Sequence, residues 1–151
     1  MDLDSAMAVS ASGLEVQRRR MNVIASNLAN VNTTKTAGGG PYRRRDLMIR
    51  SEPLRQPFKS LLNSTSLPSP SSPPEAPGVR AVRVVEDSRP PRQVYEPHHP
   101  DANAEGYVQM PDINAIEEMV NLLSASRAYE ANVTAMGLTK AMAQRALEIG
   151  R

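Results

Sequence analysis

The chain has 151 residues, of which 40% are hydrophobic, but it contains only one Phe, four Tyr and no Trp. Because aromatic rings usually dominate the buried area of a compact core, this composition disfavours a globular enzyme and favours close packing of helices. A formal charge of +2 argues against nucleic acid as a partner, and the absence of Cys excludes disulfides and thiolate metal sites.

The first predicted element is a helix of about 30 residues in a segment that contains no Pro from residue 3 to residue 32. Its apolar residues recur at alternating steps of four and three, which is typical of a helix that packs along a second helix. Asn30 and Asn32 lie where the helix should end, and we expect them to adopt the left-handed conformation that terminates helices. The stripe consists of Leu3, Met7, Ser10, Leu14, Gln17, Met21, Ile24, Leu28 and Val31.

The middle of the chain is rich in Pro, since twelve of its thirteen prolines lie between residues 41 and 100. A Ser/Pro-rich tract within residues 46–77 is unable to bury a core. Short strands are predicted at 79–85, 93–95 and 106–109, and together they would form a small hairpin-like β element. The glycines at 38–40 lack the Lys and Ser/Thr of a phosphate-binding loop and therefore indicate a turn.

The last predicted element is a helix of roughly 38 residues, which Asp112 or Asn114 would cap. One apolar stripe runs through Met119, Leu122, Ser126, Tyr129, Val133, Met136, Lys140, Ala143 and Leu147. A second apolar line runs through Ile116, Val120, Leu123, Ala131, Ala135, Leu138, Met142 and Ile149. Because a helix with one neighbour needs only one narrow stripe, the second line predicts contacts with other subunits.

Two terminal signatures indicate a family. Residues 20–34, which end in Ala29–Asn30–Val31–Asn32–Thr33, resemble the N-terminal signature of flagellar rod and hook proteins, and residues 117–133 are similar to the terminal helix of that family. Residues 39–44 and 100–108 resemble the proximal-rod proteins of the C type. The short middle segment agrees with this resemblance, because distal-rod and hook proteins carry larger inserted β domains.

The resemblance implies a structural subunit of the proximal rod in the bacterial flagellar basal body. Its terminal helices would pair as a coiled-coil-like unit, and many copies would stack helically into the torque-transmitting drive shaft of flagellar motility. It also implies type III export to the periplasmic rod without a cleaved signal peptide. The implied partners are further copies, other rod proteins and the adaptor that links the rod to the membrane ring.

We therefore predict a mainly α fold, with an N-terminal rod helix in 1–34, a Pro/Ser-rich loop with short strands in 35–110 and a C-terminal rod helix in 111–151. The asparagines expected at helix ends and across subunit boundaries are Asn27, Asn30, Asn32 and Asn132. The residues expected to pack between subunits are Leu14, Met21, Ile24, Leu28, Val31, Ile116, Met119, Val120, Leu123, Tyr129, Val133 and Met136.

Two alternatives remain open at the level of sequence. A cytosolic coiled-coil adaptor would explain the helical stripes, but not the second apolar line. A small enzyme would have to use His98, His99 and Asp101, yet adjacent histidines beside prolines are poorly placed to converge on a metal. We therefore assign no catalytic residue, metal ligand or cofactor, and we expect no membrane-inserted segment. The arginine clusters at 18–20 and 43–45 are either solvated or directed at acidic neighbours.

Overall fold

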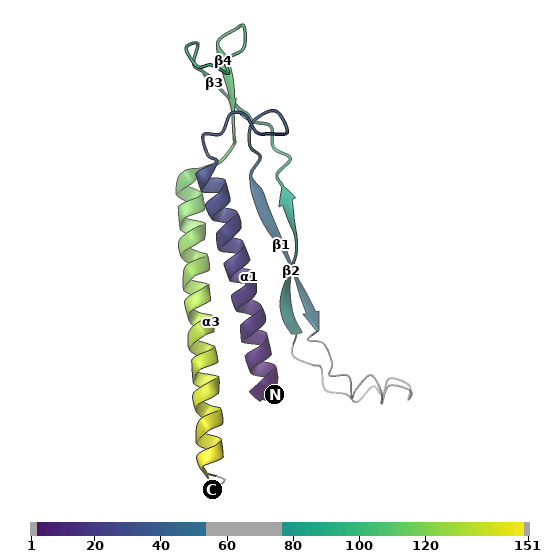
Figure 1. Ribbon diagram of the computed structural model, residues 1–151, viewed down its shortest axis with the longest axis vertical. Helices are drawn as coiled ribbons and strands as arrows, with labels where there is room; N and C mark the ends of the chain where they lie inside the picture. The colour runs from purple at the N-terminus through teal and green to yellow at the C-terminus, as the bar shows by residue number, and fades with distance from the viewer. Residues whose placement is uncertain (1–2, 54–76, 150–151) are drawn as a thin grey trace, which may run out of the picture.

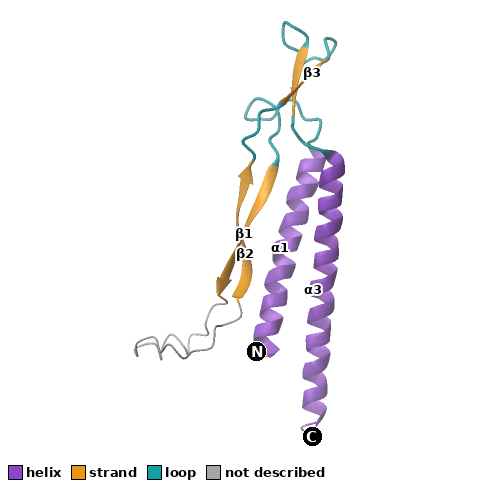
Figure 2. Cartoon of the chain, turned by 180° about the vertical axis from the view of Figure 1, so that it is seen from behind, coloured by secondary structure: helices purple, strands orange, loops and turns teal. Residues whose placement is uncertain are grey.

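The computed structural model describes residues 3–53 and 77–149. Two long helices lie side by side and antiparallel, so both ends of the described chain lie at the same end of an elongated molecule (Figure 1). A long two-stranded ribbon follows the N-terminal helix, and a short ribbon projects at the opposite end (Figures 1 and 2). In chain order the elements are α1 (Leu3–Ala29), β1 (Arg45–Pro53), β2 (Pro77–Glu86), β3 (Arg92–Tyr95), β4 (Tyr107–Met110) and α3 (Ala115–Ile149).

The prediction of a mainly α fold is wrong, although both terminal segments are helical. About 50% of the described residues are in helices and 21% are in antiparallel strands. The three predicted strands are present, but β2 pairs with β1 and β3 pairs with β4, so they do not form one hairpin-like element. The sequence does not predict β1, because its apolar residues form one short run without alternation, and the ladder with β2 stabilises it.

Helix α1 ends at Ala29 and is closed by side-chain hydrogen bonds. Asn30 Nδ2 donates to the carbonyl oxygen of Ser26 at 2.8 Å, and Thr33 Oγ1 donates to Asn30 Oδ1 at 3.1 Å. The expected left-handed conformation of Asn30 and Asn32 is wrong, since only glycines have a positive φ among the described residues. The Asn30 side chain instead adds a second hydrogen bond to the Ser26 carbonyl oxygen, which also accepts from the backbone N of Asn30 at 3.2 Å.

The predicted turn at the three consecutive glycines is confirmed. Gly39 and Gly40 have φ angles of +82° and +78°, a conformation that glycine adopts without steric cost. Thr36 N donates to Gly40 O, and Gly39 N donates to Thr36 O, both at 2.9 Å. This turn lies between α1 and β1 and precedes Tyr42, a buried residue of the junction described below.

Helix α3 begins after Asn114, which is the cap. Asn114 Oδ1 accepts hydrogen bonds from the backbone N of Ile116 at 3.0 Å and of Glu117 at 3.4 Å. Asp112, the other predicted cap, instead pairs with Arg89 at 3.1 Å. One polar side chain therefore satisfies two backbone N–H groups at the start of this long helix.

We expect Asn114→Ala to lower the free energy of unfolding by about 1 kcal/mol, because two N–H groups lose their acceptor. Urea denaturation followed by far-UV circular dichroism measures this change. Asn114→Asp is the matched control: it keeps an acceptor and places a negative charge at the helix N-terminus, so its stability should stay near that of the wild type. An equal loss in both variants would contradict the capping role.

The stripe of α3 that packs on α1 follows the predicted steps of four and three. At every second position, however, the buried residue is the one that precedes the predicted residue. Met119 and Val133, which the apolar pattern placed in the stripe, are 49% and 48% exposed. The apolar pattern favours Met119 and Val133 because the neighbouring residues that in fact face α1 are polar or small. The residues of the stripe, all buried or half-buried, are Glu118, Leu122, Ala125, Tyr129, Asn132, Met136, Thr139 and Ala143.

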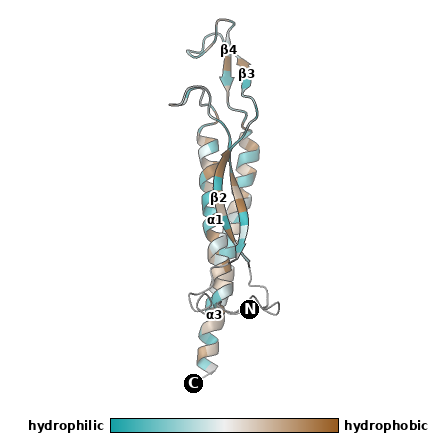
Figure 3. Cartoon of the chain, turned by 90° about the vertical axis from the view of Figure 1, so that its right-hand side faces the viewer, coloured by the Kyte–Doolittle hydropathy of each residue, from teal (hydrophilic) through white to brown (hydrophobic). Residues whose placement is uncertain are grey.

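The long ribbon of β1 and β2 packs against α1 and is irregular near its middle. Its register shifts between Met48 and Ile49, where Val82 of β2 has no opposite residue. An extra residue in one strand increases the local twist. Figure 3 shows the ribbon running lengthwise along α1, which is the only described helix or strand that it contacts outside itself.

Candidate assembly surfaces and a buried polar junction

A polar junction is buried where the end of α1 meets the start of β1 and of α3. The Asn27 side chain, 1% exposed, lies at its centre. Its Nδ2 donates to Glu118 Oε2 at 3.0 Å and to Arg45 O at 2.8 Å, and its Oδ1 accepts from Arg45 N at 2.9 Å and from the Tyr42 hydroxyl at 3.2 Å. These four bonds use the full hydrogen-bonding capacity of an asparagine side chain within one chain.

Glu118 is the carboxylate of this junction and is also 1% exposed. Arg44 compensates its charge: Nε lies 2.9 Å and Nη2 2.8 Å from Glu118 Oε1. Because an isolated buried carboxylate is costly, this pairing allows a charged residue to occupy the stripe between the helices. Sequence periodicity missed Glu118, because only its distant partners make it a suitable interior residue.

The other predicted asparagines lie at different places. Asn132 is half-buried between the helices, where its side chain lies against Gly13 and donates to Ala128 O at 3.0 Å. Asn30 closes α1, and Asn32 is exposed just beyond the helix. The four asparagines therefore do not form one cluster, and Asn27 and Asn132 contact residues of their own chain.

The predicted packing residues of α1 are covered within the chain to different degrees. Ile24 is buried, with 6% exposure. The remaining four are only half-buried: Leu14, Met21 and Leu28 lie in α1, and Val31 lies just after it. These four residues keep apolar surface that is accessible in a single copy.

An apolar line runs along α3 on the side away from α1; we call it the outer face. It contains large side chains that are at least 60% exposed, and they are Ile116, Val120, Leu123, Leu138 and Met142. Met119 and Val133, described above, are about half exposed beside it, whereas Tyr129 and Met136 are half-buried in the stripe. Exposed large apolar side chains that gather on one helix face mark interaction sites, so the outer face is a candidate for contact with other molecules.

Helix α3 also extends past the end of α1 (Figure 1). Leu147 follows Ala143 by four residues and continues the stripe that packs on α1, yet it is 75% exposed. Helix α3 has 35 residues and α1 has 27, so the shorter helix does not reach this position. The overhanging part of α3 is therefore a second apolar surface without cover from its own chain.

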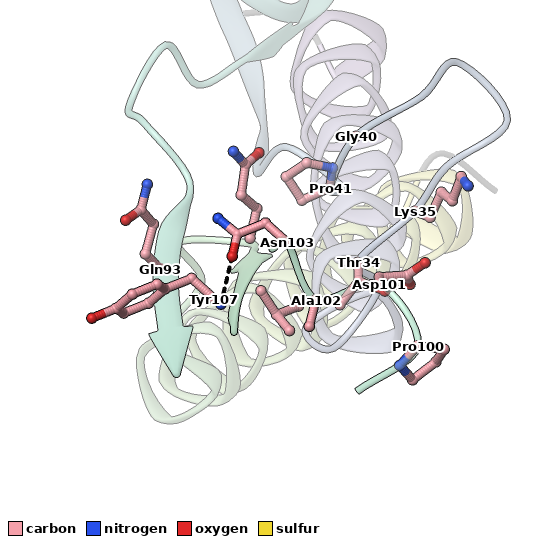
Figure 4. A pocket seen from close by; sticks show the side chains of 12 residues that line it. Thr34, Lys35, Gly40, Pro41, Gln93, Pro100, Asp101, Ala102, Asn103 and Tyr107 are labelled. Carbon is pink, nitrogen blue, oxygen red and sulfur yellow. Dashed lines mark hydrogen bonds between the residues drawn. The ribbon is translucent and has the colours of Figure 1, made fainter. Parts of the chain in front are cut away.

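At the opposite end, a cavity of about 430 Å³ lies between the loop after α1 and the short ribbon (Figure 4). Thr34 Oγ1 donates to Asp101 Oδ2 at 2.7 Å across it. Asn103 Oδ1 accepts from the backbone N of Tyr107 at 2.8 Å and so closes the turn between β3 and β4. The lining mixes polar and apolar residues, and it comes from the loop after α1, from β3 and β4, and from the turn between these strands.

The histidine pair does not converge on a site. His99 Nδ1 accepts a hydrogen bond from the backbone N of Asp101 at 3.1 Å, and His98 is exposed. Within residues 3–53 and 77–149, no three His, Asp or Glu side chains are grouped in a way that could hold a metal ion.

An ion-pair chain connects β2 to the start of α3. Arg89 contacts Asp87 at 2.8 Å and Asp112 at 3.1 Å. Hydrogen bonds from the backbone N and then the guanidinium of Arg89 lower the pKa of Asp87, and the same side-chain bond raises the pKa of Arg89. All three side chains are accessible to water. The two ion pairs therefore orient the loop between β2 and β3 more than they stabilise the fold.

In the described part of the chain, neither helix combines the length and the apolar character that crossing a membrane requires. Two family models match the terminal segments. The model described as "Flagella basal body rod protein" matches residues 7–35, and the model described as "Flagellar basal body rod FlgEFG protein C-terminal" matches residues 104–149. The first covers most of α1, and the second covers β4 and α3.

Relatives match over nearly the whole length. A protein of Bacillus subtilis strain 168 named flagellar basal-body rod protein FlgC is 47% identical over 97% of each chain. Proteins with the same name from Borreliella burgdorferi and Salmonella typhimurium are 39% and 34% identical over at least 98% of each chain. The chain belongs to the flagellar basal-body rod protein family.

Membership of the rod protein family confirms the resemblance drawn from the two terminal signatures. The chain is a structural subunit of the flagellar rod in the basal body, and this role involves assembly with other basal-body components. The names of its relatives describe structural proteins, which fits a chain that is not an enzyme.

Proposed function

We propose that this rod subunit belongs to the proximal rod and that the outer face of α3 is covered by neighbouring subunits in a helical, torque-transmitting assembly. The observation that carries this proposal is the exposure of five large apolar side chains along one line of α3. Burying one such side chain contributes about 1.5–3 kcal/mol before the costs of association are subtracted. Burial of the outer face against a neighbour is therefore favourable.

The half-buried apolar residues of α1 extend this proposal to the second helix. Leu14, Met21 and Leu28 recur every seven residues and are only half-buried in a single copy. We assign the remaining cover of these residues, and the exposed Asn32, to contacts between subunits. Contacts that join two different surfaces generate an open helical assembly when the rotation does not close.

The buried junction supports the transmission of torque in this proposal. Asn27 and Glu118 connect α1, α3 and the start of β1 through hydrogen bonds and an ion pair without exposed polar atoms of their own. A load applied to the outer face of α3 is therefore passed directly to α1 and the ribbon. The proposal also includes export without a cleaved signal peptide, a periplasmic location, and contact with other rod proteins and the adaptor at the membrane ring.

The test replaces Val120 and Leu123 by Gln in one variant. Both side chains are 60% exposed, so the isolated variant should keep the helical content and unfolding midpoint of the wild type. Its incorporation into isolated basal bodies, measured by quantitative immunoblotting, should fall at least about tenfold, since two buried anchors are lost. Swimming in soft agar should be lost with it.

Lys140→Gln is the matched control, because Lys140 is exposed on the same helix but belongs to the first predicted stripe, away from the outer face. This control should incorporate normally. Normal incorporation of the double variant would refute the assignment of the outer face. Absence of the wild-type chain from basal bodies, with stable helical dimers in the cytosol, would instead favour the adaptor hypothesis.

A further inference from the structure

A groove lies between α1 and the long ribbon, toward the end of the ribbon farthest from β3 and β4. It has a volume of about 880 Å³. Its lining includes the apolar side chains of Val16, Val79 and Val82, and the guanidinium-bearing residues Arg19, Arg50 and Arg80. No other described helix or strand of the chain covers it. We call it the basic groove.

The charges in the basic groove are not balanced by the residues that the structure describes. Glu15 pairs with Arg19, and Glu52 pairs with Arg80, but Arg50 forms no ion pair with a described carboxylate. Arg50 and Arg80 also lie directly opposite each other in the ladder between β1 and β2. Because like charges in opposite positions destabilise a ribbon, the groove favours an additional carboxylate from outside.

The complementary chemistry lies at one end of the molecule, in the turn of the short ribbon, residues 95–107, which we call the tip. The rings of Tyr95 and Tyr107 meet edge to face at 5.3 Å and are 64% and 41% exposed as residues. Glu96 and Glu105 are exposed beside them, and neither carboxylate pairs with a described residue. From residue 93 to residue 126 the chain contains six carboxylates and no Lys or Arg.

We propose that the basic groove of one copy binds the tip of a second copy. This inference rests on the proposed function and names the partner of a further surface. Tyr side chains are typical anchors in pockets between proteins, and Arg at the rim suits both carboxylates and aromatic faces. The tip lies at one end of the long axis and the basic groove lies beside the middle of α1, so the contact joins two different surfaces and continues from copy to copy.

Cysteine cross-linking tests the contact directly, because the natural chain contains no Cys. A chain carrying Glu96→Cys in the tip and Arg50→Cys in the basic groove should form a ladder of cross-linked dimers, trimers and longer species in isolated basal bodies. The control chain carries Glu96→Cys with Asp46→Cys, which lies exposed near the start of β1 and outside the lining of the basic groove. The first pair should cross-link about tenfold more, since only thiols held in contact have a high effective concentration.

A charge exchange provides the second test. Glu96→Arg and Arg50→Glu should each reduce incorporation into basal bodies several-fold, and the combination should restore most of it, because the attraction is re-formed with opposite signs. Circular dichroism verifies that each isolated variant keeps its helices.

Assembled rods without a ladder, equal ladders in the two cysteine pairs, or no restoration in the combined variant would overturn this inference while leaving the proposed function intact. A cross-linked product of the basic groove with a different protein would also overturn it. Absence of the wild-type chain from basal bodies would instead refute the proposed function.

Discussion

Replacing Glu118 by Ala should lower the free energy of unfolding by about 3–5 kcal/mol, the cost of removing one partner from a buried ion pair. The loss is large because the buried Asn27 amide and the half-buried Arg44 guanidinium both lose the carboxylate that they share. Urea denaturation of the purified chain, followed by circular dichroism, measures the change. Loss of this one carboxylate should also loosen the start of β1.

Two matched variants control this prediction. Glu118→Gln keeps an acceptor for Asn27 but removes the charge that faces Arg44, so its loss should be intermediate. Glu117→Ala changes the exposed neighbour and should alter the free energy of unfolding by no more than about 0.5 kcal/mol. If Glu118→Ala were as mild as Glu117→Ala, the junction would not stabilise the fold.

Gly13→Leu should separate the two helices and lower the free energy of unfolding by about 1–3 kcal/mol. A Cβ atom at Gly13 would lie 3.1 Å from the Asn132 side chain, which leaves no room for a larger group. The clash opposes a gain of about 0.8–1 kcal/mol, which replacement of Gly by a better helix former provides. Thermal unfolding measures the sum of the two effects.

A second substitution separates space from helix propensity. Combining Gly13→Leu with Asn132→Ala should recover most of the stability, since the smaller residue provides the missing volume. Gly137→Leu is the control, because Gly137 is exposed in α3 and no atom lies within 4 Å of the position of its Cβ. That variant should be slightly more stable than the wild type. A destabilised Gly137→Leu chain would show that spacing between the helices is not the cause.

The helices were predictable because their signals are local. Absence of Pro, the steps of four and three, and the Asn114 cap all lie within the segment that they shape, and the glycine turn is equally local. The outer face was predictable for the same reason. A second apolar line on α3 is visible in the sequence, and the structure leaves Ile116, Val120 and Leu123 exposed.

The features that the sequence did not reveal depend on partners distant in the chain. Strand β1 exists through its ladder with β2, and Glu118 is an interior residue only because Arg44 and Asn27 reach it. Periodicity weighs each residue by its own polarity, so it selected Met119 over Glu118 for the stripe. For this reason the predicted stripe of α3 is wrong by one residue at every second position.

The shift in register at Met48 and Ile49 affects how unassembled copies associate before they join the rod. A two-stranded ribbon has two open edges, and a long flat edge is a template for amyloid-like growth. The extra residue Val82 bends and twists the ribbon, so its free N–H and C=O groups do not form one straight row. Pairing of ribbon edges between unassembled subunits is therefore disfavoured. Association through specific side-chain contacts is favoured instead.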